Sequence, residues 1–145
     1  MQYADLVRLY FERSASLQGY WTLYVVIIGG LLAFSSLRHI PDKVTGILVT
    51  ALFLFFAYKN LGAIHDVTLQ RQATLEAIKA TASPADAAGS ASLSEIRAKL
   101  EPTLVSPDWE GTQYFHITCD AITVLALWAM ELRRMRHAKK IAATA

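Results

Sequence analysis

Three long apolar runs constrain this chain more than any other feature of its sequence. They cover residues 20–37, 43–64 and 114–130. The first run holds no charged side chain, the second holds only two lysines, and the third is interrupted only by His116 and Asp120. A helix that crosses a bilayer needs about 20 predominantly apolar residues. The sequence therefore predicts three transmembrane helices.

The composition agrees with a membrane protein. Hydrophobic residues make up 54% of the 145 residues and charged residues make up 18%, whereas soluble domains carry about 25% charged residues. The net charge is only +2, and no basic stripe interleaved with aromatic residues occurs, so we expect no nucleic-acid partner. We predict an all-α fold, an integral membrane helical bundle in a single domain.

The N-terminal segment, residues 1–18, is predicted to form an amphipathic helix. Its apolar residues recur on one face at helical spacing: Tyr3, Leu6, Val7, Tyr10 and Phe11. Such a helix lies on the membrane or docks on the bundle. We expect the region of Gly19 to let it bend away from the first span.

The second span is predicted to continue as one helix to about residue 81, because no glycine or proline interrupts residues 63–83. At a rise of 1.5 Å per residue, a helix over residues 43–81 is about 60 Å long. Its outer half must then project outside the membrane. That half is partly apolar, so it needs a partner surface.

The region after this helix contains three further predicted segments. They are a flexible linker over 82–91, a short amphipathic helix over 92–101 and a last helix over 107–140 that includes the third span. The short helix would open with a capping box from Ser92 to Glu95. Ser106 and Pro107 have the residue types of an N-cap and a first helical position.

The distribution of basic residues predicts the orientation. The tail after the third span carries basic residues and no acidic one: Arg133, Arg134, Arg136, Lys139 and Lys140. The connection over residues 59–113 holds five basic and seven acidic residues. The positive-inside rule then places the C-terminus in the cytoplasm and, with three spans, the N-terminus outside. We predict a multi-pass protein of the bacterial inner (plasma) membrane, whose basic tail could also bind lipid headgroups.

Four polar side chains of the third span share one helical face: His116, Cys119, Asp120 and Thr123. Polar groups at this depth normally face the interior of a bundle or a water-filled cavity. The face therefore predicts either a structural polar network or the lining of a proton or ion path.

A metal or haem site is a further hypothesis for the same region. His65 follows the second span, and the predicted topology places it on the same side of the membrane as His116 and Asp120. Two imidazoles and a carboxylate could bind zinc, copper or iron, and paired imidazoles could bind haem. The spacing matches no known ligand motif, so our main interpretation expects no cofactor.

The sequence favours a non-enzymatic protein. Cys119 is its single cysteine, so one chain can form neither a disulfide nor a cysteine-based zinc site. No glycine-rich phosphate loop occurs, and no nucleophile–base pair can be assigned from spacing. Small residues follow one face of the first span (Gly29, Ala33 and Ser36) and of the second (Gly46, Thr50 and Ala57), which permits close helix packing.

Three functions remain open from the sequence. The first is an assembly role, as a homo-oligomer or as an accessory subunit of a larger membrane complex. The second is a homo-oligomeric channel or membrane-permeabilising effector, because three spans, an outer N-terminus and a basic tail resemble the topology of one class of phage holins. The third is a metal- or haem-binding redox protein that uses His65, His116 and Asp120.

Overall fold

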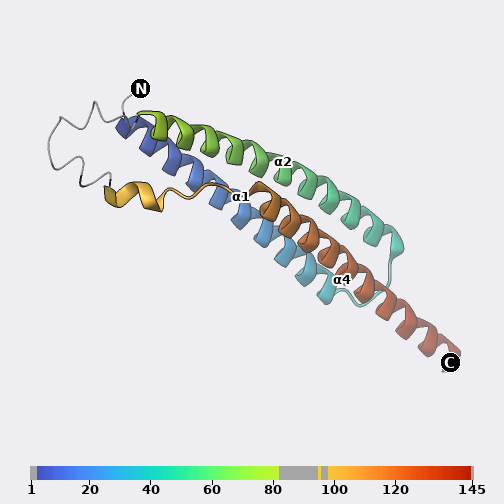
Figure 1. Cartoon of the computed structure of the whole chain (residues 1–145). Coiled ribbons are helices and arrows are strands. Elements are labelled where there is room, and N and C mark those ends of the chain that lie inside the picture. Colours follow the sequence, from blue (N-terminus) through green and yellow to red (C-terminus); the bar gives the residue numbers. More distant parts are fainter. Residues whose placement is uncertain (1–2, 82–94, 96–97, 145) are drawn as a thin grey trace. The chain divides into compact units, whose positions relative to one another are not determined.

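The computed structural model describes residues 3–81, 95 and 98–144, and every regular element among these residues is a helix (Figure 1). The elements are α1 (Tyr3–Leu37), α2 (Lys43–Thr81), a short 3-10 helix η2 (Glu101–Thr103) and α4 (Trp109–Thr144). The helices α1, α2 and α4 are each long and apolar enough to cross a membrane. The prediction of an all-α fold with three candidate spans is thus confirmed.

Helix α1 passes through Gly19 as one helix of 35 residues, so the predicted amphipathic segment and the first candidate span belong to one continuous helix. A Cβ atom at Gly19 would meet nothing within 4 Å, so no close contact requires a glycine there. A single glycine inside a helix costs only about 1 kcal/mol relative to alanine. The helical segments on either side easily offset that cost.

Helix α2 has the expected boundaries, and α4 differs from its expected boundaries by a few residues. Helix α2 ends at Thr81, where the unbroken helical pattern of the sequence ends. Helix α4 begins at Trp109 and ends at Thr144, so Ser106 and Pro107 precede it. Asp108 comes directly before α4, and aspartate is also a preferred N-cap residue, which accounts for the later start.

Part of the predicted connection lies outside the described residues. This applies to the linker over 82–91 and to residues 92–94 and 96–97 of the short amphipathic helix. Residues 98–100 are helical and lead directly into η2. The C-terminal end of that predicted helix is thus present.

The chain divides into two compact units, and each has its own packing. One unit contains Met1–Gly19 and Ile64–Trp109. Its buried core consists of Leu6 and Tyr10 from α1, Leu75 and Ile78 from α2, and Leu104. The N-terminal amphipathic face and the outer half of α2 were each expected to need a partner. In this unit they cover each other.

Tyr10 anchors this first unit through its hydroxyl group. The hydroxyl donates a hydrogen bond to the carbonyl oxygen of Val105 at 2.9 Å and accepts one from Nη2 of Arg71 at 2.8 Å. The Arg71 guanidinium also lies 5.0 Å from the centre of the Tyr10 ring. The segment before α4 is therefore tied to α1 and α2.

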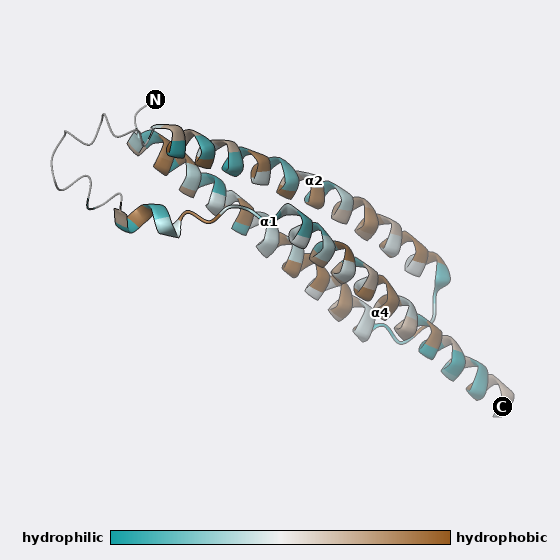
Figure 2. Cartoon of the chain, in the orientation of Figure 1, coloured by the Kyte–Doolittle hydropathy of each residue, from teal (hydrophilic) through white to brown (hydrophobic). Residues whose placement is uncertain are grey.

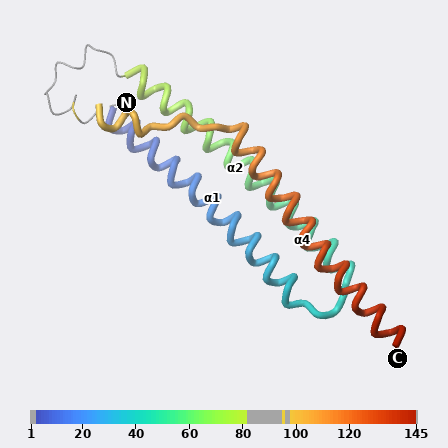
Figure 3. The backbone as a smooth tube through the Cα atoms, turned by 60° about the horizontal axis from the view of Figure 1, so that its bottom comes forward, coloured from blue at the N-terminus to red at the C-terminus, as the bar shows by residue number. Residues whose placement is uncertain are grey.

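The second unit contains Tyr20–Ala63 and Glu110–Ala145 and includes the candidate spans. Tyr24 contacts Asp120, and Ser35 contacts Arg134, so α4 runs parallel to α1. The turn between α1 and α2 makes α2 antiparallel to both. In Figure 3 the end of α4 passes beyond this turn.

Hydropathy varies along the helices of this second unit (Figure 2). Apolar residues dominate the middle of each helix, and the end of α4 is markedly more hydrophilic. Four side chains of α2 and α4 are buried at mid-span: Phe53, Ala57, Thr123 and Leu127. The Thr123 hydroxyl donates to the carbonyl oxygen of Cys119 at 2.8 Å, so this polar group is satisfied within its own helix.

Candidate functional site

Two groups of polar side chains lie at different levels of the second unit. The His116 cluster comprises Tyr24, Asn60, His116 and Asp120, and the Glu131 cluster comprises Ser35, Arg38, Asp42, Glu131 and Arg134. Along α4, His116 and Glu131 are separated by about 22 Å at 1.5 Å per residue. This is comparable to the roughly 30 Å hydrocarbon thickness of a bilayer. The two clusters thus lie near opposite ends of the spans.

His116 is the centre of the first cluster and is fully buried, with 0% of its surface exposed. Its Nδ1 lies 3.0 Å from Oδ2 of Asp120, one turn later on α4. Its Nε2 lies 3.3 Å from Nδ2 of Asn60 on α2. Both ring nitrogens therefore have a partner, one within α4 and one on a second helix.

Tyr24 brings the third helix into this cluster. Its hydroxyl donates to Oδ1 of Asp120 at 2.7 Å and lies 3.3 Å from the carbonyl oxygen of His116. Its ring packs against the imidazole with 4.1 Å between centres, and Trp21 lies 5.7 Å from the same imidazole. Aromatic rings of α1 thus cover the histidine.

The donors and acceptors of the His116 cluster are consistent with a neutral imidazole. The Asn60 amide nitrogen can only donate, so Nε2 of His116 acts as the acceptor. Nδ1 then carries the proton and donates it to the Asp120 carboxylate. That carboxylate accepts hydrogen bonds from both Tyr24 and His116. The hydrogen bonds thus run without a break from Asn60 to Tyr24.

Glu131 is the centre of the second cluster and is only 2% exposed. Its Oε1 accepts a hydrogen bond from the backbone N–H of Asp42 at 2.7 Å. Its Oε2 accepts hydrogen bonds from Nη2 and Nε of Arg134 at 2.8 and 3.2 Å, and it lies 3.8 Å from Nη1 of Arg38. The buried carboxylate is therefore compensated by two guanidinium groups.

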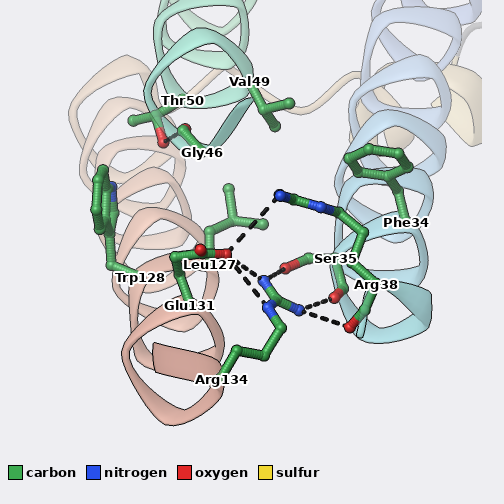
Figure 4. Close-up of a pocket in the computed structure, with 10 residues that line it drawn as sticks. All are labelled: Phe34, Ser35, Arg38, Gly46, Val49, Thr50, Leu127, Trp128, Glu131 and Arg134. Carbon is green, nitrogen blue, oxygen red and sulfur yellow. Dashed lines mark hydrogen bonds and ion pairs between the residues drawn. The ribbon is translucent and has the colours of Figure 1, made fainter. Parts of the chain in front are cut away.

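Arg134 uses its remaining donors at the end of α1. Its Nη1 donates to the carbonyl oxygens of Ser35 and Arg38, and Nη2 lies 3.3 Å from the Ser35 hydroxyl (Figure 4). The last carbonyls of a helix lack intrahelical partners and carry partial negative charge. The guanidinium of Arg134 therefore acts as a C-cap for α1.

Asp42 forms the N-cap of α2 on the other side of the same turn. Its Oδ1 accepts hydrogen bonds from the backbone N–H groups of Val44 and Thr45 at 3.0 and 3.4 Å, and its Oδ2 accepts from the Thr45 hydroxyl at 2.5 Å. Mainly the Thr45 side-chain hydrogen bond, and then the backbone N–H groups and Arg38, lower the pKa of the Asp42 carboxyl group. The ionised carboxylate is the capping form.

A small cavity lies beside the Glu131 cluster (Figure 4). Its volume is about 20 Å³, and its apolar walls include Val49, Leu127 and Trp128. A cavity of this size holds about one water molecule. A Cβ atom at the adjacent Gly46 would lie 4.0 Å from Cγ of Glu131, an ordinary van der Waals contact, so α2 and α4 approach each other here without requiring a glycine.

The remaining residues singled out from the sequence fall at several different places. His65 belongs to the first unit, where its ring lies 4.4 Å from that of Trp109 and its Nδ1 lies 3.9 Å from Oδ1 of Asp66. Cys119 is a half-buried free thiol beside Asp120. Among the described residues, no three His, Cys, Asp or Glu side chains are grouped to hold a metal ion. The metal and haem hypotheses stay predictions.

The five basic residues of the tail do not form a uniform group. Arg134 has a side chain that is 12% exposed and bonded to Glu131 and to the end of α1, and its assignment to headgroup contact stays a prediction. The other four are at least partly exposed: Arg133, Arg136, Lys139 and Lys140. These four are the more exposed members of the set.

Several residues of both clusters were missed by the sequence analysis. Asn60 stands in an apolar continuation of the second run, and Glu131 comes directly after the third run. A signal was present for Asp42, because aspartate before a helical run is typical of an N-cap. The spacing of Glu131 and Arg134, three residues apart, also favours an ion pair on one helical face.

Comparisons with protein family models, with curated proteins and with solved structures find no significant match for this chain. The function of this chain is therefore inferred from its own geometry.

Proposed function

We propose that this chain is a non-enzymatic membrane protein with an assembly role, as a homo-oligomer or as an accessory subunit of a larger membrane complex. The polar side chains of both clusters support this, because they are bonded to one another and hold α1, α2 and α4 together. The cavity beside Glu131 accommodates about one water molecule. A structural role accounts for both clusters.

The observation that carries the proposal is an open small-residue face on α1. Gly29, Gly30 and Ala33 are exposed, and a Cβ atom at either glycine would meet nothing within 4 Å. Larger apolar side chains flank this face, with Val26 62% and Phe34 47% exposed. Small residues four apart let the backbones of two transmembrane helices approach closely. We assign this face to a second copy of the chain.

The three long apolar helices and the basic tail support a membrane location and an orientation for the chain. We place the chain in the bacterial inner membrane with the N-terminus outside and the basic end of α4 in the cytoplasm, on the basis of the positive-inside rule. A single cysteine at Thr144→Cys in a Cys119→Ser background tests this orientation. A membrane-impermeant maleimide should label it only after the cells are opened, and labelling in intact cells would refute the orientation.

Cross-linking in the native membrane tests the assembly proposal. In the Cys119→Ser background, Ala33→Cys should form a disulfide-linked dimer under mild oxidation. Leu125→Cys is the matched control, because it lies on α4 and is 69% exposed, and it should stay monomeric. Adding Gly29→Ile to the Ala33→Cys protein should abolish the dimer, because a β-branched side chain keeps the two backbones apart.

Native mass spectrometry of the gently extracted protein distinguishes the alternatives. A closed homo-oligomer or a defined heteromeric complex agrees with an assembly role, and a monomer without cross-links contradicts it. A bound metal or haem mass would favour the redox alternative. Membrane leakage and growth arrest on expression would favour the channel alternative, in which Asp120 or Thr123 faces a central axis.

A further inference from the structure

A groove of about 520 Å³ lies between the end of α1 and the C-terminal part of α4. The α4 side of this groove is one helical face, made by Met130, Arg133, Arg134, His137, Ala138 and Ile141. These positions recur at the three- and four-residue spacing of neighbours on a helix. The opposite side comes from Ser36, Arg38 and His39. All of these residues belong to the second unit.

The charges around the groove leave one permanent cation available. Arg38 and Arg134 are both within ion-pair distance of Glu131. Arg133 has no ion-pair partner among the described residues, and residues 132–144 contain no acidic side chain. Its neighbours on the groove, His39 and His137, add imidazole donors. The groove therefore presents an uncompensated guanidinium with further hydrogen-bond donors, which suits a phosphate group.

The groove also has an apolar border on the side of the spans. Met130 lines it there, and at the adjoining turn Leu37 is 74% and Ile40 is 79% exposed. It begins where the apolar runs of α1 and α4 end, which is the level of the lipid headgroups in a membrane-spanning arrangement. A ligand there can place a charged group against Arg133 and alkyl chains against the border.

We propose that this groove binds the phosphate headgroup of an anionic phospholipid. The guanidinium of Arg133 contacts the phosphate, and the acyl chains lie along the exposed apolar side chains below it. Arg136, Lys139 and Lys140 do not line this groove, and they line an adjoining hollow that shares Arg133 and His137 with it. The proposed site is contained in a single chain, so it does not depend on the proposed assembly role.

The test compares two arginines of the same helix. The full-length protein, the Arg133→Gln variant and the Arg136→Gln variant are purified in a mild detergent and titrated with phosphatidylglycerol. Native mass spectrometry then measures the fraction of protein that retains one lipid. Phosphatidylcholine serves as the zwitterionic control, and glycerol phosphate serves as a soluble competitor that lacks acyl chains.

The wild-type protein should retain phosphatidylglycerol in preference to phosphatidylcholine. Arg133→Gln should weaken this retention about fivefold, the effect of one basic residue close to a headgroup, and Arg136→Gln should change it less than about twofold. Arg133→Lys, which keeps the charge but not the planar guanidinium, should fall between the wild type and Arg133→Gln. A circular dichroism spectrum checks that each variant keeps its helices.

Three outcomes would overturn the proposal. Equal losses in Arg133→Gln and Arg136→Gln would show a general attraction by the tail. Equal retention of the two lipids by the wild type would show that charge is not recognised. Displacement of the lipid by an equimolar amount of glycerol phosphate would show that the ligand is a soluble phosphate ester.

Discussion

The two polar clusters of the second unit hold the same three helices together by different physical means. The His116 cluster connects side chains to side chains, through neutral donors that converge on one carboxylate. The Glu131 cluster connects α4 to the backbone at both ends of the α1–α2 turn, with Arg134 at carbonyl groups and Glu131 at an N–H group. The cation Arg134 thus lies at the C-terminus of α1, and the anion Glu131 lies at the N-terminus of α2, where each charge is favourable.

This difference determines how each cluster should respond to a substitution. In the Glu131 cluster, removing one charge leaves buried opposite charges and helix ends without compensation, which is costly. In the His116 cluster, removing Asp120 leaves only neutral partners, and removing Tyr24 or His116 leaves a carboxylate that keeps its other hydrogen bond. We therefore expect the Glu131 cluster to be the more sensitive of the two.

The largest expected effect is that of Glu131→Ala. It should lower the free energy of unfolding by about 3–5 kcal/mol, the usual cost of removing one partner of a buried ion pair. Unfolding by sodium dodecyl sulfate in mixed micelles, followed by circular dichroism, measures this change. Leu132→Ala, an exposed neighbour at 47%, is the control and should change stability much less. Exposed ion pairs contribute up to about 1 kcal/mol. A loss below about 1 kcal/mol for Glu131→Ala would therefore refute the claim that the Glu131 cluster is the more sensitive of the two.

An intermediate effect is expected for Asp120→Asn in the other cluster. The substitution keeps the size of the side chain but removes the charge that accepts hydrogen bonds from Tyr24 and His116. Hydrogen bonds to charged groups contribute about 1.5–3 kcal/mol, so we expect a loss of about 2 kcal/mol in the same unfolding assay. Glu110→Gln, on the exposed first turn of α4, should have almost no effect. A larger loss for Asp120→Asn than for Glu131→Ala would reverse the proposed ranking.

The candidate spans were predictable from the sequence because length and apolarity alone decide whether a helix can cross a bilayer. The three apolar runs sufficed for α1, α2 and α4. The packing of the N-terminal helix on the outer half of α2 was not predictable in the same way. Both segments show an apolar face. The sequence alone does not reveal which two faces pack together, and in the structure Leu6 and Tyr10 pack with Leu75 and Ile78.

Within the two polar clusters, only the contact between His116 and Asp120 on α4 was predicted from the sequence. His116 and Asp120 are four residues apart, so their contact follows from helical geometry. Tyrosine is common near a membrane surface, so the position of Tyr24 in the sequence does not by itself indicate a polar contact. Its bond to Asp120 depends on the rotation of α1 about its axis, which packing determines. The partners of Arg134 depend on where the α1–α2 turn brings the helix ends, and the charge pattern does not contain that information.

A smaller effect is expected for Tyr24→Phe, which removes one hydroxyl group and keeps the ring against His116. We expect a loss of about 1 kcal/mol, the net value of one buried hydrogen bond. In the double variant Tyr24→Phe/Asp120→Asn, the combined loss should be smaller than the sum of the two single losses, because both substitutions break the same contact. Strict additivity would show that the hydroxyl of Tyr24 does not stabilise Asp120.

The smallest effect should come from Asp42→Asn, and it should depend on pH. Asparagine caps a helix about as well as aspartate, so the substitution tests only the charge at the N-terminus of α2. Hydrogen bonds from Thr45 hold the pKa of the Asp42 carboxyl below its ordinary value of 3.8. The ionised carboxylate therefore stabilises the folded state above pH 3.8, and this contribution is lost as the pH falls through the lower pKa of the folded protein.

The wild type should accordingly be more stable than Asp42→Asn by a constant amount from about pH 5 to about pH 7. The difference should disappear progressively below pH 3.8, the ordinary pKa of the carboxyl group. The same unfolding assay, repeated across this pH range, measures it. A difference that varies between about pH 5 and about pH 7 would show that a group other than Asp42 causes it, and this would contradict the prediction.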